Sequence, residues 1–159
     1  MSIQAVKQYL SSFGLADRVM ELSTSSATVE LAAQALGVEG ARIAKTLSLH
    51  AADGGCMLIV TAGDTKIDNP KFKATFGAKA RMLSPDEALA MTGHAVGGVC
   101  PFALPEGVAV YLDVSLQRFQ TVFPACGSAN SAIELDVETL YSVSRAHGWV
   151  DVCKIKTEQ

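Results

Sequence analysis

Lys45 is the first residue whose type and setting could support chemistry. It lies in the stretch 41–49, where Thr46 and Ser48 alternate with leucines as in a half-buried strand. An ammonium group beside an apolar sheet loses hydration, so it tends to point into a cleft, to bind an anion or to acquire a lower pKa. A lysine that extends to solvent from a strand end gives the same pattern. Lys45 is therefore a candidate site residue that needs support from elsewhere in the chain.

A glycine-rich stretch over residues 92–102 is the second candidate. Gly93, Gly97 and Gly98 precede Pro101, and glycines around a proline turn let backbone N–H groups approach a ligand closely. The spacing is neither the dinucleotide fingerprint, which follows a strand, nor a P-loop, which needs Gly-Lys-Ser/Thr. The stretch is either part of a binding site or an ordinary packed turn.

His94 and Cys100 lie in the same stretch and suggest a thiol-dependent hydrolase, with the cysteine as nucleophile and the histidine as base. No third residue that would orient the histidine is apparent. The remaining cysteines are widely spaced, without the C-x-x-C pair of a zinc or redox site: Cys56, Cys126 and Cys153. A thiol hydrolase stays open as an alternative.

Positive charge is concentrated between Lys66 and Arg81, although the whole chain carries a net charge of −3. This segment has five basic residues against Asp68, a local balance of +4 that leaves −7 for the rest of the chain. Such asymmetry can produce a phosphate-facing surface on an acidic protein, or a solvated helix face. The candidate phosphate contacts are Lys71, Lys73, Lys79 and Arg81.

Composition limits the class of protein. At 159 residues, with 49% apolar and 18% charged residues, the sequence predicts a globular domain spanning residues 1–159. No apolar run approaches the ~20 residues of a membrane-spanning helix, and the first residues lack the order of a signal peptide. Because free thiols without an export signal are typical of the cytosol, we expect a cytoplasmic protein without membrane contact.

Helices and strands must place these residues. Apolar spacing, capping residues and proline positions predict helices over 2–13 (begun by Ser2), 29–36, 70–76 (capped by Asn69), 85–91 and 137–148. Alternating or continuous apolar runs predict strands over 18–22, 43–49, 56–61, 108–112, 119–123 and 132–135. Hairpins mixed with helices favour an α+β domain over a doubly wound one.

Several of these segments together resemble a known family. The matching parts are residues 25–38 continuing into 42–47, residues 83–93, residues 97–102 and residues 127–135, in the same order and at similar intervals. On these motifs the chain is similar to the YbaK/ProX prolyl-tRNA editing domains, which are stand-alone aminoacyl-tRNA deacylases. The likeness covers most of the chain.

The resemblance implies a mixed, partly curled central sheet surrounded by helices. It places an editing pocket between the strand of Lys45 and the glycine-rich stretch. Lys45 matches the functional lysine of the family, which engages the acceptor end of the tRNA. The loop formed by Gly98, Val99, Cys100 and Pro101 matches the loop that holds the aminoacyl group through its backbone.

Other residues are candidates for the pocket that this resemblance implies. Thr28, Met20 and His94 are expected to line it, and Asn130 and Ser131 to bind the substrate or to close a turn. The chain departs from the family pattern at His94, where an aromatic residue such as tyrosine is frequent. It departs again at Cys100, where small polar residues are common, and around Asn130, where some branches carry charged side chains. These departures leave the amino-acid specificity open.

The expected function is therefore a hydrolase that acts in trans on tRNA carrying a small mischarged amino acid, with tRNA-Pro as the expected tRNA. No cofactor or metal is implied, and a water activated partly by the substrate is favoured over a covalent intermediate. Transient association with prolyl-tRNA synthetase is a further expectation, and the sequence does not specify an oligomeric state. The alternative from another class is a module that binds an aminoacyl or nucleotide end without turnover.

Overall fold

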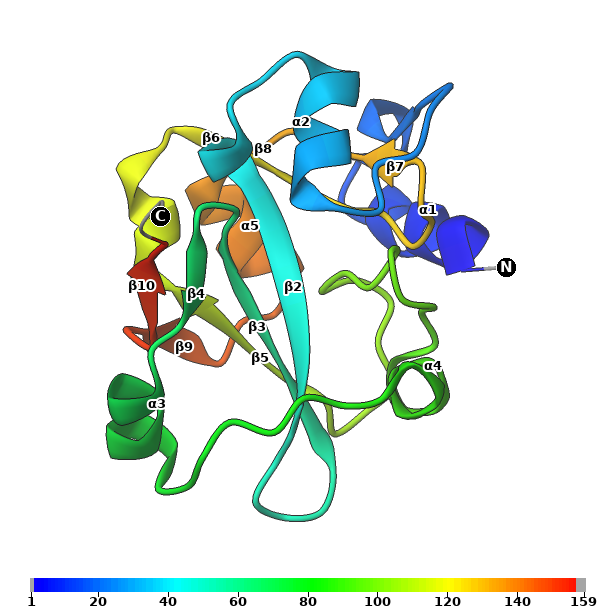
Figure 1. The fold of residues 1–159 in the computed structure, drawn as a ribbon. Coiled ribbons are helices and arrows are strands. Elements are labelled where there is room, and N and C mark those ends of the chain that lie inside the picture. Colours follow the sequence, from blue (N-terminus) through cyan, green and yellow to red (C-terminus); the bar gives the residue numbers. More distant parts are fainter. Residues whose placement is uncertain (1, 157–159) are drawn as a thin grey trace.

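A six-stranded mixed sheet forms the centre of the protein (Figure 1). A computed structural model describes residues 2–156. The strands follow one another across the sheet in the order β8 (Leu135–Asp136), β6 (Thr121–Pro124), β2 (Ile43–His50), β3 (Cys56–Ala62), β5 (Ala109–Asp113) and β9 (Gly148–Val150). The β2–β3 and β6–β8 pairs are antiparallel, whereas β2–β6, β3–β5 and β5–β9 are parallel.

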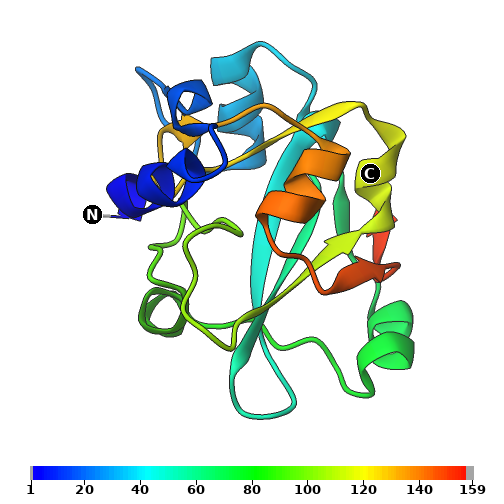
Figure 2. The same ribbon diagram turned by 180° about the vertical axis from the view of Figure 1, so that it is seen from behind.

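Two short ribbons and the helices complete the architecture. In the ribbons, β1 (Met20–Glu21) pairs with β7 (Ser131–Ala132), and β4 (Thr65–Ile67) pairs with β10 (Cys153–Ile155). The α-helices are α1 (Ser2–Ser11), α2 (Val29–Leu36), α3 (Asn69–Phe76), α4 (Pro85–Thr92) and α5 (Val137–Val143). Short 3-10 helices cover Ala16–Arg18, Gly40–Arg42 and Val114–Arg118. The helices lie around the sheet in both views (Figures 1 and 2), which confirms the predicted α+β fold with a mixed sheet.

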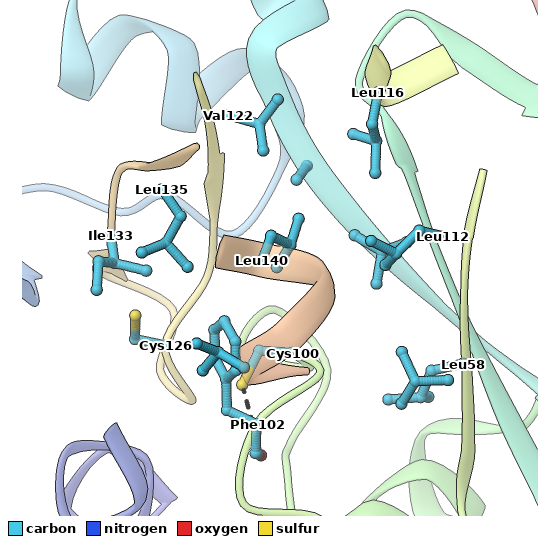
Figure 3. Close-up of a cluster of buried hydrophobic side chains, with 14 of the residues drawn as sticks. Leu58, Cys100, Phe102, Leu112, Leu116, Val122, Cys126, Ile133, Leu135 and Leu140 are labelled. Atoms are coloured by element: carbon cyan, nitrogen blue, oxygen red, sulfur yellow. Dashed lines mark hydrogen bonds between the residues drawn. The ribbon is translucent and has the colours of Figure 1, made fainter. Parts of the chain in front are cut away.

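The hydrophobic core lies on both faces of β3, all of whose residues are buried. Leu58 and Val60 point to one face, where they pack with Leu140 of α5. Figure 3 shows this larger cluster, in which Leu58, Cys100, Phe102 and Leu140 are labelled. The alternate residues of β3 point to the other face, where Phe72 of α3 covers the sheet. A strand buried on both faces explains the continuous apolar run at 56–60.

Three helices begin at the capping residues that the sequence predicted. Thr28 caps α2, Ser84 forms the capping box of α4 with Glu87, and Asp136 caps α5. At α3 the prediction was wrong by one residue, because Asp68 rather than Asn69 is the N-cap. The Asp68 carboxylate accepts a hydrogen bond from the Lys71 N–H at 3.2 Å, which satisfies one of the open donors of the first turn.

Two other predictions at the secondary-structure level were wrong, and three short strands were not predicted. The segment 132–135 is two short strands in different sheets, since Ala132 pairs with Met20 whereas Leu135 pairs with Val122. The last helix ends at Val143 rather than continuing to 148, and Gly148 opens β9 instead. The strands β4, β9 and β10 are three residues each, too short to give a recognisable alternating pattern.

Among residues 2–156, no helix has the length and apolar character needed to cross a membrane.

Candidate functional site

The candidate site is a cavity of about 420 Å³ along the free edge of β2. It exists because β6 pairs with β2 only at Ile43 and Ala44, and the segment 81–83 pairs with the same edge only at the far end, where Met82 bridges to Leu49. The β2 edge between these two contacts has no neighbouring strand among the described residues. The loop before α2, the start of α4, the glycine-rich loop and the segment around β7 close around this edge. In Figure 1, α2 and α4 lie near the two ends of β2. The lining residues are Ser26, Ala27, Thr28, Val29, Ala32, Ile43, Ala44, Lys45, Thr46, Ser48, Met82, Leu83, Pro85, Val96, Gly97, Val99, Phe123, Ala125, Ser131 and Ala132.

Lys45 borders this cavity, and its ammonium group is held at the β4 side of the strand. The Nζ atom donates a hydrogen bond to the carbonyl oxygen of Thr65. Burial lowers the pKa of Lys45, and the nearby positive charge of Lys156 lowers this pKa further. A lysine with a lowered pKa that is partly desolvated gains from the arrival of an anion, because a negative charge favours its protonated form.

No carboxylate within residues 2–156 lies at ion-pair distance from Lys45. The carboxylate that raises the pKa of Lys45 is that of Asp64, which Arg118 binds through both terminal guanidinium nitrogens, at 2.7 and 3.1 Å. The arginine holds the pKa of Asp64 below its usual range. Lys45 and Lys156 thus form a pair of positive charges, and their acidic neighbour Asp64 is already engaged by Arg118, so an anionic ligand would relieve their repulsion.

The glycine-rich loop closes the cavity by backbone packing. Gly97 has a φ of +96°, and the Gly98 N–H donates to the Ala95 carbonyl at 2.9 Å. A Cβ atom on Gly98 would lie 2.7 Å from backbone atoms of Gly127 and of Ser128. The loop therefore packs directly on the 127–128 backbone, and this contact requires glycine.

His94 and Cys100 lie beneath this loop in the core, outside the cavity lining. The Cys100 Sγ lies 3.6 Å from the His94 Nε2, which itself lies 2.8 Å from the Phe102 carbonyl oxygen. Since a carbonyl can only accept, Nε2 carries the proton and Nδ1 accepts from the Ser2 hydroxyl. Complete burial raises the pKa of Cys100 to about 12. A thiol that stays protonated next to an imidazole whose nitrogens are both engaged does not support the thiol-hydrolase alternative.

Replacing Cys100 with alanine is expected to retain most of the hydrolytic activity, because the thiol neither lines the cavity nor ionises near neutral pH. The measurement is kcat/KM for deacylation. Circular dichroism checks that the small cavity left by the missing sulfur is tolerated. A loss of more than about 100-fold in a folded variant would identify the thiol as the nucleophile after all.

The structure brings together only some of the sequence-predicted substrate contacts. Thr28, Val99 and Ser131 line the cavity along with Lys45. The predicted contacts that do not belong to its lining are Met20, His94, Gly98, Cys100, Pro101 and Asn130. Met20 packs behind the wall formed by Ile43 and Phe123, and the Asn130 side chain donates to the Leu22 carbonyl at 3.1 Å. Asn130 therefore closes a turn.

Sequence reasoning missed several lining residues, above all Ser26, Thr46 and Ser48. The period of two along β2 would have placed Thr46 and Ser48 on one face, opposite Lys45. Nothing local indicated that this face borders a cavity, because the opening depends on how far β6 extends along β2.

The predicted phosphate contacts lie on and after α3. Lys71 forms an ion pair with Asp151 at 3.0 Å and also donates to the Cys153 carbonyl, which ties α3 to β10. The other three, Lys73, Lys79 and Arg81, are exposed and form no ion pair with residues 2–156. Next to α3, Lys66 of β4 stands directly opposite Lys154 of β10. Like charges in this position destabilise a β-ribbon unless an anion lies between them.

Comparison with known proteins finds a family model, sequence relatives and solved structures that resemble this chain. The sequence model of the aminoacyl-tRNA editing domain matches residues 24–142. YwhH of Bacillus subtilis (strain 168) is 56% identical over 154 residues, which are 97% of this chain and 98% of YwhH. EbsC of Enterococcus faecalis (strain ATCC 700802 / V583), a candidate Cys-tRNA(Pro)/Cys-tRNA(Cys) deacylase, is 30% identical over 118 residues, 74% of this chain and 72% of EbsC. A solved structure described as a candidate trans-editing enzyme for prolyl-tRNA synthetase has a TM-score of 0.86 and 28% identity, and the match covers 96% of this chain and 97% of that one.

Proposed function

This chain belongs to the aminoacyl-tRNA editing domain family, and we propose that it hydrolyses the ester bond between a small, wrongly attached amino acid and tRNA-Pro. The observation that carries this proposal is the cavity on the β2 edge with Lys45 at its border. The cavity can hold a small aminoacyl group, and the half-buried lysine can bind a backbone phosphate of the acceptor end. The 28%-identical neighbour described as a trans-editing enzyme and the EbsC relative support the same reading.

The reaction needs a water molecule to attack the ester carbonyl, which yields the free amino acid and a tRNA with its terminal hydroxyl restored. No histidine or carboxylate is among the cavity residues that the structure describes. We therefore assign activation of the water partly to the substrate itself, through its α-amino group or the neighbouring ribose hydroxyl. Lys45 contributes by fixing the acceptor end and by stabilising the negative charge that develops in the transition state. The backbone around Val99 faces the aminoacyl group.

The tRNA body approaches, in this proposal, over the β4–β10 ribbon and α3. Lys156 adjoins Lys45, and the opposed pair of Lys66 and Lys154 continues the positive charge toward α3. The predicted contacts Lys71, Lys73, Lys79 and Arg81 extend the same surface. We also propose that residues 1–159 act as one deacylase domain in the cytoplasm and that prolyl-tRNA synthetase is a transient partner.

The test is a deacylation assay with one tRNA-Pro transcript charged in turn with different amino acids. We expect release of a small amino acid and no release of proline. Tight binding of charged tRNA with no release from any member of the panel would instead identify a binding module without turnover. Equal release from tRNAs of several unrelated identities would contradict the assignment of tRNA-Pro.

Reversing Lys73 and Lys79 to glutamate is expected to raise the KM for charged tRNA while the Lys71–Asp151 pair stays intact. Phosphate contacts act by releasing counterions, so losing two of them lowers the slope of log affinity against log salt by about 1.4–1.8. KM is measured at several salt concentrations. A minimal aminoacyl-nucleotide serves as the control substrate, because it cannot reach this surface. Equal losses on both substrates would mean that α3 supports the pocket instead.

A further inference from the structure

One buried histidine has no part in the proposed hydrolysis. His94 is 1% exposed and contributes nothing to the cavity lining. Burying an imidazole costs free energy unless its nitrogens form hydrogen bonds, so both nitrogens need partners inside the protein. The partners of His94 show which parts of the chain this side chain holds together.

The imidazole ties the two ends of the glycine-rich loop to each other. Its Nε2–H donates to the Phe102 carbonyl at 2.8 Å, which closes the segment 94–102 at its base. Inside the segment, the Gly98 N–H bonds to the Ala95 carbonyl at 2.9 Å, which forms a local turn but reaches neither end. The middle of the segment forms one wall of the cavity, through Val96, Gly97 and Val99. His94 therefore fixes the base of a loop whose middle belongs to the candidate site.

The other ring nitrogen ties this base to α1. Nδ1 accepts a hydrogen bond from the hydroxyl of Ser2, the first residue of that helix. Ser2 also packs on Gly127, since a Cβ atom there would lie 2.7 Å from Ser2 Oγ. The 127–128 backbone in turn contacts Gly98 in the middle of the loop. The start of α1 thus supports the loop at two places, at its base through His94 and at its middle through the 127–128 backbone.

The surroundings of His94 favour the neutral imidazole. Burial lowers its pKa, and the hydrogen bond with the Phe102 carbonyl opposes this shift only in part. The other groups at the ring are the Ser2 hydroxyl of α1 and the Cys100 thiol, whose pKa of about 12 keeps it uncharged. No carboxylate in the described part of the chain forms an ion pair with His94. A proton added to Nδ1 would therefore place an unpaired positive charge in the core.

We propose that His94 is a positioning residue for deacylation: through its two hydrogen bonds, the neutral imidazole holds the glycine-rich loop in the shape that lines the cavity. This inference rests on the proposed deacylase function and adds to it a residue that does not touch the substrate. Displacing a substrate-positioning element by ~1 Å can lower the rate about 10²-fold. The ring can therefore affect hydrolysis from beneath the loop.

The first test removes the hydrogen-bond donor of the ring and then restores it. His94→Leu keeps a buried side chain but leaves the Phe102 carbonyl without a donor, so kcat for deacylation is expected to fall at least about tenfold with little change in KM. His94→Gln offers an amide N–H to the same carbonyl, so its kcat is expected within about threefold of wild type. Full activity of His94→Leu, or equal inactivity of the two variants when both are folded by circular dichroism, would overturn the inference.

His147→Gln is the matched control for removing an imidazole. His147 is exposed, and its Nδ1 accepts from the Val110 N–H at 3.3 Å, far along the chain from the glycine-rich loop. The amide oxygen of glutamine can accept the same hydrogen bond, so kcat should be unchanged.

Hydrogen exchange supplies a second readout, which needs no substrate. When the loop opens, His94 regains its ordinary pKa of about 6.5 and takes up a proton below that pH, whereas the closed loop keeps it neutral. Because the open state then binds more protons, acid favours opening. The protection factor of the Gly98 amide, corrected for the intrinsic exchange rate at each pH, is expected to fall at least about threefold more in wild type than in His94→Gln between pH 7 and pH 5.

Two results of this measurement would contradict the positioning role. One is the same pH dependence of Gly98 protection in wild type and in His94→Gln. The other is a Gly98 amide that exchanges as slowly as the amides of β3, because the loop would then open only when the whole protein unfolds.

Failure of the inference can be told apart from failure of the proposed function. If the wild-type protein releases no amino acid from any charged tRNA, the deacylase function fails, whereas the exchange measurement still reports whether His94 holds the loop. If the wild-type protein is active and His94→Leu is equally active, the function stands and the positioning role is wrong. Should His94→Leu fail to fold, wild type and His94→Gln still give the exchange comparison.

Discussion

Replacing Lys45 with alanine is expected to lower kcat/KM for deacylation by at least about 100-fold while the fold stays intact. Removal of one group that stabilises developing negative charge typically costs about 10²- to 10³-fold in rate. The fold should tolerate the change, because the side chain is only half-buried and its polar contact is one carbonyl, that of Thr65. The measurements are steady-state kinetics on charged tRNA and circular dichroism on the purified variant.

Two further substitutions at this position separate charge from packing. Lys45→Met keeps the aliphatic stem and removes the ammonium, so it should be as inactive as the alanine variant. Lys45→Arg keeps a positive charge that does not depend on a lowered pKa, and it should retain part of the binding affinity for tRNA. Near wild-type activity of Lys45→Ala, or an unfolded protein, would contradict the role assigned to this lysine.

Introducing a single methyl group at Gly98 is expected to reduce activity by about 100-fold, since displacing a substrate-positioning element by ~1 Å can cost this much. The new Cβ of Gly98→Ala would lie 2.7 Å from the backbone of residues 127 and 128, which cannot move as a flexible side chain would. The loop bearing Gly97 and Val99 must shift instead, and both residues line the cavity. Such overpacking typically destabilises a protein by about 1–3 kcal/mol, which lowers Tm by a few degrees.

Gly148→Ala provides the matched control for this prediction. Gly148 lies in β9 with a negative φ, and a Cβ there meets no atom within 4 Å. It should leave kcat/KM unchanged, which shows that loss of activity does not follow from any glycine substitution. If Gly98→Ala were fully active, the direct packing of the glycine loop on the 127–128 backbone would not be needed for hydrolysis.

Features that depend on residues close together in the chain could be predicted from the sequence. The caps at Thr28, Ser84 and Asp136 begin helices because their side chains accept hydrogen bonds from backbone N–H groups three residues later. The continuous apolar run at 56–60 predicted a central strand, and the alternation at 43–49 predicted its neighbour. Family membership also followed from the sequence, since it rests on several motifs in a fixed order, and the matching family model covers residues 24–142.

Which residues surround the cavity depends on the packing of distant segments and could not be predicted from the sequence. Met20, His94 and Asn130 had the right residue types for a pocket, yet they pack behind its wall or close a turn, because their neighbours in space come from distant parts of the chain. The cavity itself opens only because β6 stops pairing with β2 after Ala44. Burial, hydrogen-bond satisfaction and the pKa of a side chain depend on the three-dimensional packing around it. No local pattern in the sequence encodes them.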